Sequence, residues 1–412
     1  MEAIYDSVCG LDVHSASVQA CVRWRSQDGR TLQELRSFGT MTRDLLGLAD
    51  WMKAKGVTQV AMESTGVYWK PIYNILEGHF TVLLVNAQHV KHVPGRKTDV
   101  KDCQWLAQLL QCGLLNASFV PDRPQRDMRD LTRHRAQLVA QQVAVVNRIH
   151  KTLEDTNIKL GLVASDILGA SGRDMLRALI DGQQTPEQMA ELARCRLRKK
   201  IPTLRVALQG HVTDHHRFVL AELMDQLQDL ERRIERFSQR IEEISGPFKA
   251  AIQAVMTVPG FERRAAENLI AEIGIDMSRF PTAGHLASWA GICPGSHESA
   301  GKRKSGKTTR GSRWLKATLV QAGWAATHKK NSSYQAQYRR LAGRRGKKRA
   351  LVAVGHSLLV TVYHMLSRGC AYKELGGDYL DKRQSDSAVK HHIRRLESLG
   401  YKVTATRMES AA

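Results

Sequence analysis

Apolar residues that recur at alternating steps of three and four constrain the fold of this chain most. They are Leu220, Leu223, Leu227, Leu230, Ile234, Phe237, Ile241 and Ile244. This spacing, with charged residues between, predicts a long helix with one apolar stripe, typical of a coiled-coil seam. The stripe needs a partner, and one candidate is a long helix predicted from Gln125 to about Leu153, a segment without Gly or Pro. A second copy of the chain is the other candidate, and the sequence leaves the choice open.

The first 120 or so residues alternate between strand-like and helix-like patterns. Three short strands come first, at 7–12, 17–24 and 32–38, followed by a helix at 42–55, a strand at 57–62, a helix at 68–76 and a strand at 80–85. A meander followed by α/β alternation predicts a mixed sheet with helices packed against its faces.

The remaining chain is expected to be mostly helical. Gly246 and Pro247 end the seam helix, and this is the clearest boundary in the sequence. The stretch 159–212, with the basic run Arg194–Lys200, shows no regular pattern. A short amphipathic helix is expected around Ala388 to Leu399. These patterns predict an α/β domain at 1–124, a helical coiled-coil region with an irregular insertion at 125–247, a mostly α-helical domain at 248–375 and a polar extension at 376–412.

Basic residues dominate one segment. The formal net charge is +22, and residues 299–373 contain no Asp or Glu but 18 Lys or Arg, so most of the excess lies there. A surface that only needs to be soluble usually mixes both signs, so this segment predicts contact with a nucleic acid. The cations we expect to contact it are Lys302, Arg303, Lys304, Lys307, Arg310, Arg313, Lys316, Arg344, Arg345, Lys347, Lys348 and Arg349.

The sequence predicts a cytoplasmic protein with no membrane partner. It has no run of 18 apolar residues, and its start carries acidic residues, unlike a signal or transit peptide.

Four carboxylates in the first domain are spaced for a metal site. Asp12 ends the first predicted strand, Glu63 directly follows a later one, and Asp99 and Asp102 lie one helical turn apart. Such acids repel each other unless a cation holds them, and oxygen ligands suit Mg²⁺ or Mn²⁺. The alternative is that they are solvated loop acids and a helix-start Asp.

Two motifs in the C-terminal domain bear on nucleic-acid contact. Met256–Phe261 followed by Leu269–Gly274 reads as helix, tight turn and helix, whose turn amides can face a phosphate, or else as a plain αα-hairpin. The loop from Trp289 to Lys302 then leads from an apolar helix into the basic segment. Taken alone, a loop rich in Ser, Gly and Lys indicates phosphate binding without catalysis.

Three strings in the first domain resemble the DEDD insertion-sequence transposases. They are Gly10-Leu11-Asp12-Val13-His14, Met62-Glu63-Ser64-Thr65-Gly66-Val67-Tyr68 and Arg96-Lys97-Thr98-Asp99-Val100-Lys101-Asp102. The resemblance implies a RuvC-like (RNase H-like) fold whose acidic tetrad, here Asp12, Glu63, Asp99 and Asp102, holds the metal. It extends to the C-terminal serine transposase domain, where Ser299 matches the nucleophile and Ser296 and Ser305 are fallback candidates. Ala300 stands where members often have Gly.

The resemblance also implies an activity and partners. These are cutting and rejoining of donor and target DNA through a phosphoserine intermediate, guided by a bridge RNA, in a homodimer or homotetramer. Two alternatives stay open: a metal-dependent Holliday-junction-type nuclease that uses only the acidic tetrad, and a non-catalytic nucleic-acid binder.

Overall fold

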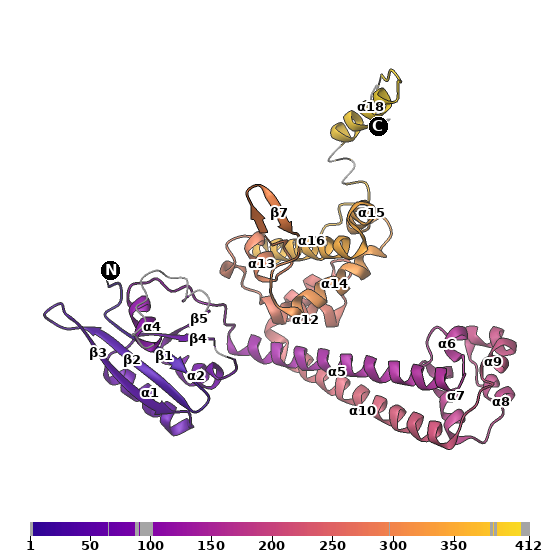
Figure 1. The fold of residues 1–412 in the computed structure, drawn as a ribbon, viewed down its shortest axis with the longest axis horizontal. Coiled ribbons are helices and arrows are strands. Elements are labelled where there is room, and N and C mark those ends of the chain that lie inside the picture. Colours follow the sequence, from indigo (N-terminus) through magenta and orange to yellow (C-terminus); the bar gives the residue numbers. More distant parts are fainter. Residues whose placement is uncertain are drawn as a thin grey trace. The chain divides into compact units, whose positions relative to one another are not determined.

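The computed structural model describes residues 3–64, 66–86, 90, 102–295, 297–379, 382 and 385–404. It divides into two compact units, residues 1–121 and 122–412. Each unit is described by itself below, with the elements labelled as in Figure 1. The boundary predicted at 247 lies inside the second unit and stays a prediction.

The first unit contains a five-stranded mixed sheet with the strand order β3-β2-β1-β4-β5. Its strands are β1 (Ser7–Val13), β2 (Ser17–Arg25), β3 (Thr31–Gly39), β4 (Gln59–Glu63) and β5 (Thr81–Val85). The first three form an antiparallel meander, and β4 and β5 run parallel to β1. This confirms the predicted mixed sheet, and the arrangement is compatible with an RNase H-like fold.

Helices cover both faces of this sheet. One face packs against α1 (Thr42–Ala54) and α2 (Trp69–Leu76), and the other packs against α4 (Asp102–Gln111). Because neighbouring side chains of a strand point to opposite faces, Leu11 joins the core with α1 and α2, whereas Val8 joins the core with α4.

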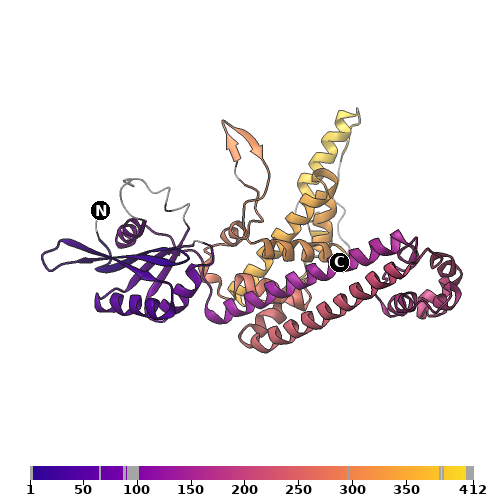
Figure 2. The same cartoon turned by 60° about the horizontal axis from the view of Figure 1, so that its bottom comes forward.

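The second unit is built on two long antiparallel helices, α5 (Arg123–Asp155) and α10 (Asp214–Ile244), which lie side by side in Figures 1 and 2. The side chains of Asp155 and His216 meet near one end, and the rings of His134 and Phe237 meet nearer the other. The seam residues from Leu220 to Ile234 are buried. The seam's partner is therefore α5 of the same chain, while a supercoiled geometry stays a prediction.

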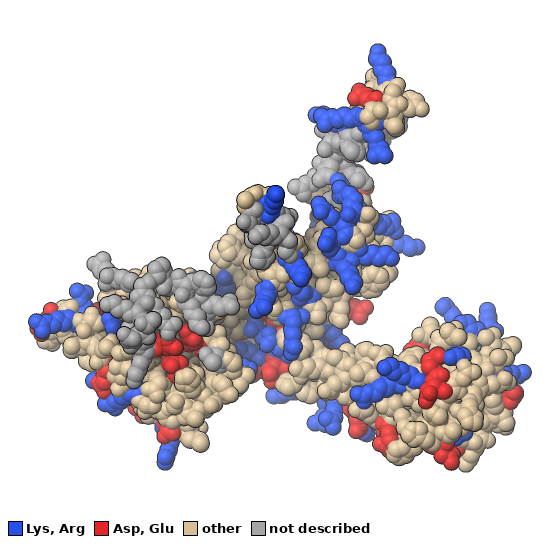
Figure 3. All heavy atoms as spheres, in the orientation of Figure 1, with Lys and Arg blue, Asp and Glu red and all other residues tan. Residues whose placement is uncertain are grey.

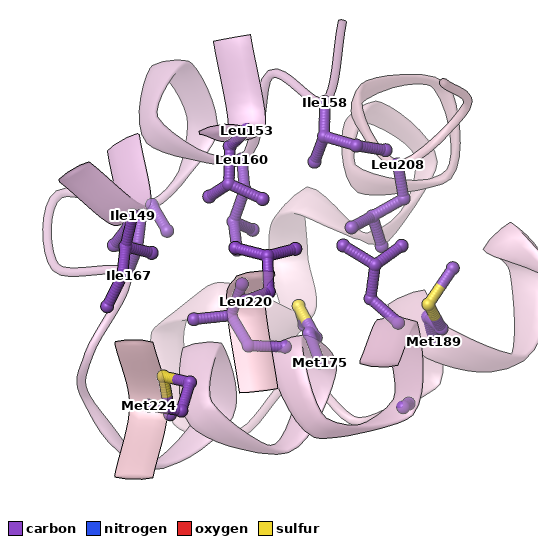
Figure 4. Packing of buried hydrophobic residues seen from close by; sticks show 14 of the residues in the cluster. Ile149, Leu153, Ile158, Leu160, Ile167, Met175, Met189, Leu208, Leu220 and Met224 are labelled. Carbon is purple, nitrogen blue, oxygen red and sulfur yellow. The ribbon is translucent and has the colours of Figure 1, made fainter. Parts of the chain in front are cut away.

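The stretch 159–212, for which the sequence showed no regular pattern, folds into a small helical tip between α5 and α10 (Figure 1). Its elements are α6 (Leu160–Val163), α7 (Ala170–Asp181), α8 (Pro186–Glu191), the 3₁₀ helix η1 (Cys195–Lys200) and α9 (Ile201–Ala207). Figure 4 shows Leu160, Met175 and Leu208 gathered with Ile149 of α5 and Leu220 of α10 in one core. The tip is therefore held by the ends of the two long helices.

The rest of the second unit is mostly helical, as predicted, and contains one short hairpin. Its elements are η2 (Gly246–Phe248), α11 (Lys249–Met256), α12 (Arg263–Ile273), η3 (Met277–Arg279), α13 (Ala283–Trp289), a hairpin of β6 (His297–Ser299) and β7 (Lys302–Ser305), α14 (Arg313–Thr327), α15 (Ser333–Arg345), α16 (Lys347–Arg368) and α18 (Ser385–Ser398). Among the described helices, α16 is long and apolar enough to cross a membrane by length and composition alone. Its Val354, Leu358 and Val362 are fully buried inside this unit, as in the core helix of a folded domain.

Candidate catalytic and nucleic-acid-binding sites

Asp12 and Glu63 occupy neighbouring positions at one edge of the sheet. Leu11 of β1 pairs with Met62 of β4 in parallel register, so the next residues, Asp12 and Glu63, lie side by side at the carboxyl ends of adjacent strands. Neighbouring strands lie about 4.8 Å apart. Strand alternation puts both side chains on the face that α4 covers, because Val8 and Ala61 on that face pack in the core with α4.

Asp102 is the first residue of α4, the helix on that same face. The helix comes very close to β1 at Gly10, where an added Cβ would lie 2.2 Å from the carbonyl oxygen of Cys103 and 2.5 Å from the amide nitrogen of Ala107. Glycine at position 10 therefore lets α4 lie directly on β1, the strand that carries Asp12 next to its last residue. Local packing brings three of the four predicted acids to one face, and Asp99 lies outside the described residues.

The immediate surroundings of Asp12 include a histidine. His14 Nε2 lies 3.3 Å from Asp12 Oδ2, and the Asp12 side chain is 28% exposed. Across the part of the chain that the structure describes, no three His, Cys, Asp or Glu side chains lie close enough together to hold a metal ion. The side chains of Asp12, Glu63 and Asp102 nevertheless offer oxygen ligands, and oxygen ligands suit a hard divalent cation.

The predicted nucleophile Ser299 ends β6, one strand of a short antiparallel hairpin. Ser299 pairs with Lys302, and Ala300 and Gly301 form the two-residue turn between them. Both turn residues have positive φ, +51° at Ala300 and +73° at Gly301. This is typical of a type I′ turn, in which glycine is favoured at both positions. The side chains of Ser299 and Ser305 and all of Ser296 lie outside what the structure describes.

A buried carboxylate anchors the chain just after this basic loop. Ser312, the N-cap residue of α14, donates its hydroxyl to Glu272 Oε2 at 3.0 Å. Arg133 of α5 donates to both oxygens of Glu272, at 2.7 and 3.0 Å. Glu272 thus joins α5, α12 and the start of α14. No sequence signal indicated this contact, because its partners are far apart along the chain.

A second buried pair fastens α5 to α12. Arg135 Nη1 lies 2.7 Å from Glu267 Oε2, and both side chains are 3% exposed. Burial lowers the pKa of Arg135, and the adjoining Glu267 opposes that shift. Burial also lowers the pKa of Arg129, which donates to the Ala271 carbonyl, to about 10.

The predicted DNA-facing cations are solvent-exposed wherever their side chains are described, except Lys316. Lys316 is half-buried and donates to Thr308 Oγ1 at 2.6 Å, and the guanidinium of Arg313 lies 4.6 Å from the Trp314 ring centroid. The side chains of Arg303 and Lys304 lie outside the description. Figure 3 shows Lys and Arg gathered over α15 and its neighbours with few acids among them. This surface suits a polyanion.

The turn between α11 and α12 packs inward. Gly260 has φ +91°, and a Cβ there would lie 2.1 Å from the carbonyl oxygen of Ala322 in α14. Val258, Pro259 and Phe261 are buried. This packing favours the plain αα-hairpin over a turn that faces a phosphate.

Two family models match the chain. One, a transposase model of the DEDD type from IS110 elements, matches residues 9–158. The other, described as the transposase IS116/IS110/IS902 family, matches residues 252–339. The sheet with its acidic edge and the first match define a transposase of the DEDD class. Because both matches point to one group of elements, the chain belongs to the IS110/IS116 family of mobile-element transposases.

Curated relatives agree with this family. The probable family 20 transposase of Pseudomonas aeruginosa is 28% identical over 322 residues, which cover 76% of this chain and 85% of the relative. The transposase for insertion sequence element IS1111A of Coxiella burnetii is 22% identical over 295 residues, covering 70% and 72%. The uncharacterized 44.8 kDa protein of insertion element IS116 of Streptomyces clavuligerus is 28% identical over 270 residues, covering 57% and 64%. Family membership implies DNA cleavage and rejoining, and the DEDD domain implies use of a divalent metal.

Proposed function

We propose that this transposase cuts and rejoins DNA through a phosphoserine intermediate formed by Ser299, with a divalent metal held by Asp12, Glu63, Asp99 and Asp102. One observation carries the proposal. The register of β1 and β4 sets Asp12 beside Glu63 on the sheet face that α4 covers, and α4 begins with Asp102.

The carboxylates would hold Mg²⁺ or Mn²⁺, since both cations prefer oxygen ligands. A cation bound there would offset the negative charge of a DNA phosphate and stabilise charge on the attacking and leaving oxygens. Asp12 also lies beside His14, whose Nε2 is 3.3 Å from Asp12 Oδ2.

The serine step would exchange one phosphate ester for another. Ser299 Oγ forms a bond to the phosphorus, the hydroxyl proton leaves to a base, and the bond from phosphorus to one sugar oxygen breaks and that oxygen takes a proton. The reverse step, with a sugar hydroxyl from another strand, releases the serine and rejoins DNA. Because the number of ester bonds is conserved, rejoining needs no external energy source.

The chain's cations would hold the DNA and lower the barrier. Lys302 pairs with Ser299 in the hairpin, and Arg310 and Arg313 lie on the exposed continuation of the same segment. Donors fixed near a phosphate stabilise the charge that develops on it during transfer.

The proposal includes a guide RNA and more than one copy of the chain. The acid-free segment 299–373 carries 18 cations, which suits contact with both DNA and a structured RNA. We propose that a bridge RNA selects donor and target DNA, and that a homodimer or homotetramer brings the acidic site of one copy to the serine of another.

A search for a covalent adduct between protein and DNA tests this function. The purified full chain, with any RNA that copurifies, is incubated with donor and target DNA and Mg²⁺, then denatured and resolved on a gel. We expect an adduct in the parent and in Ser305→Ala, and none in Ser299→Ala. Cleaved DNA with no adduct in any protein would instead indicate a hydrolytic nuclease, and binding without cleavage would indicate a non-catalytic binder.

A further inference from the structure

The basic run in the helical tip, residues 194–200, lies outside both segments that the family models match. In the structure it forms η1 (Cys195–Lys200), on the surface of the tip at the far end of the α5–α10 hairpin from α11. An α10 of 31 residues is about 46 Å long. The run is therefore well separated from the basic surface over α15.

Both ends of the run are fixed to the tip. The backbone amide of Arg194 donates to Ser171 Oγ at 2.9 Å, and its guanidinium pairs with Asp174. At the other end, Lys200 Nζ donates to the carbonyl oxygen of Val163 at 2.7 Å. Leu197, in the middle, packs against the tip core. These contacts attach both ends and the centre of the run to the tip.

Three cations in the middle of this basic run differ from every other cation of the tip in their hydrogen-bond and ion-pair partners. In residues 159–212, all of which the structure describes, the other Lys and Arg side chains have a carboxylate partner, or in the case of Lys200 a carbonyl. Arg196, Arg198 and Lys199 are exposed and have neither. Residues three apart in a 3₁₀ helix are stacked on one side, so Arg196 and Lys199 present like charges in one direction.

Such an arrangement is unfavourable without an anion. Like charges on one side of a turn repel each other, and two carboxylates of the tip, Asp174 and Glu191, are paired with other cations. A ligand with regularly spaced negative charges relieves the repulsion at several side chains at once. The phosphates of a nucleic-acid backbone have this property, and this family acts on DNA.

We propose that Arg196, Arg198 and Lys199 form a second, separate contact for the sugar-phosphate backbone of a nucleic-acid duplex. The contact reads no sequence, because it consists of flexible cations directed at phosphates. It rests on the proposed function only in that a nucleic acid is the substrate. It extends the bound duplex along the hairpin, beyond the basic surface over α15.

Salt dependence of binding tests the contact. Fluorescently labelled DNA and RNA duplexes of about 30 base pairs, roughly 100 Å long, are titrated with the full chain at several salt concentrations. Each phosphate contact contributes about 0.9 to the slope of log affinity against log salt, so the triple variant R196Q/R198Q/K199Q should lower the slope by about 2 to 3. The duplex, DNA or RNA, that shows this loss identifies the natural ligand of the tip.

A matched variant separates this contact from a general loss of charge. Lys159→Gln, Arg177→Gln and Arg205→Gln together remove the same charge from the same tip, but each of these cations is already paired with a carboxylate. We expect this variant to change the slope by less than 1, by the same relation. An equal change of slope in the two triple variants would overturn the contact and leave the proposed function standing. The same holds if the slope of R196Q/R198Q/K199Q equals that of a parent that binds.

Two further outcomes are decisive. A parent that binds neither duplex would overturn both the contact and the proposed function. Should the triple variant fail to fold, acetylation of Lys199 in the parent replaces it. We expect bound duplex to protect Lys199 from the reagent, and unchanged acetylation would overturn the contact.

Discussion

Gly10 of β1 lies where α4 packs against the sheet, and α4 carries Asp102 of the acidic site. In Gly10→Ala the new Cβ would lie 2.2 Å from the Cys103 carbonyl oxygen, whereas ordinary contacts begin at about 3.4 Å. The difference is about 1.2 Å, and both the strand and the helix present backbone atoms at this point. We therefore expect α4 to move away from β1 by about this distance.

The magnitude follows from the contacts that α4 would lose. Leu106 and Leu110 are almost fully buried against the sheet, and a gap of 0.5 to 1 Å forfeits roughly a quarter to a half of each dispersion contact. We expect Gly10→Ala to lower the free energy of unfolding by about 3 kcal/mol. Since Asp102 moves with α4, DNA cleavage should fall by roughly 100-fold where the protein still folds.

Urea denaturation of the full chain, with hydrogen exchange in peptides of β1 and α4, measures this change. The control is Gly47→Ala in α1, where an added Cβ meets nothing within 4 Å. That variant should stabilise the protein by about 0.5 to 1 kcal/mol, because alanine is the better helix former. A stability of Gly10→Ala within about 0.5 kcal/mol of the parent would refute the close packing of α4 on β1.

Two other changes give measurable results. Ala300→Gly removes an alanine in the left-handed conformation from the hairpin turn, so it should slow local hydrogen exchange there by roughly fivefold, about 1 kcal/mol. Gly301→Ala should speed the exchange. Equal exchange in the two variants would contradict the turn. Burial raises the pKa of Glu374, but hydrogen bonds from Ser333 and Tyr372 outweigh it and hold the pKa below its ordinary value. The stability that Glu374 contributes is therefore present above about pH 5 and lost as the pH falls. Glu374→Gln should flatten the decline of thermal stability between about pH 5 and 3. An unchanged pH profile would argue against these hydrogen bonds.

Much of the first unit could be predicted because its signals are local. Strand alternation and helical spacing are visible within windows of a few residues, so all five strands and the positions of Asp12 and Glu63 at strand ends follow from the sequence. The start of α5 was predicted at Gln125, and the helix begins at Arg123 with Asp122 as its cap. A Pro in the first turn of a helix marks such a start.

The tip could not be predicted because its core is not local. Helices as short as α6 have too few residues to show a period, and Leu160 is buried against residues that lie far away in sequence, such as Leu220. Residues of α5 and α10 complete this core, and no window of sequence contains them together.

The serine hairpin was missed for a different reason. Its strands have three and four residues, and β7 is Lys302-Arg303-Lys304-Ser305, with no apolar alternation. Its turn is Ala-Gly, without the Asn or Asp that marks most hairpins of this type. The sequence could indicate a basic loop around Ser299 but not its pairing.

The charged contacts between α5 and α12 bear on how proteins of this kind can change over time. Arg133 and Arg135 lie in the segment that the first family model matches, while Glu272 and Glu267 lie in the segment that the second one matches. Arg135 and Glu267 are both 3% exposed, and removing one member of such a buried ion pair leaves an uncompensated charge, which destabilises a protein by about 3 to 5 kcal/mol. An N-terminal half acquired from a relative would therefore fit this C-terminal half only if its own α5 carried matching arginines. Exchange of one half for a version without these residues would leave a charged side chain of the other half without its partner.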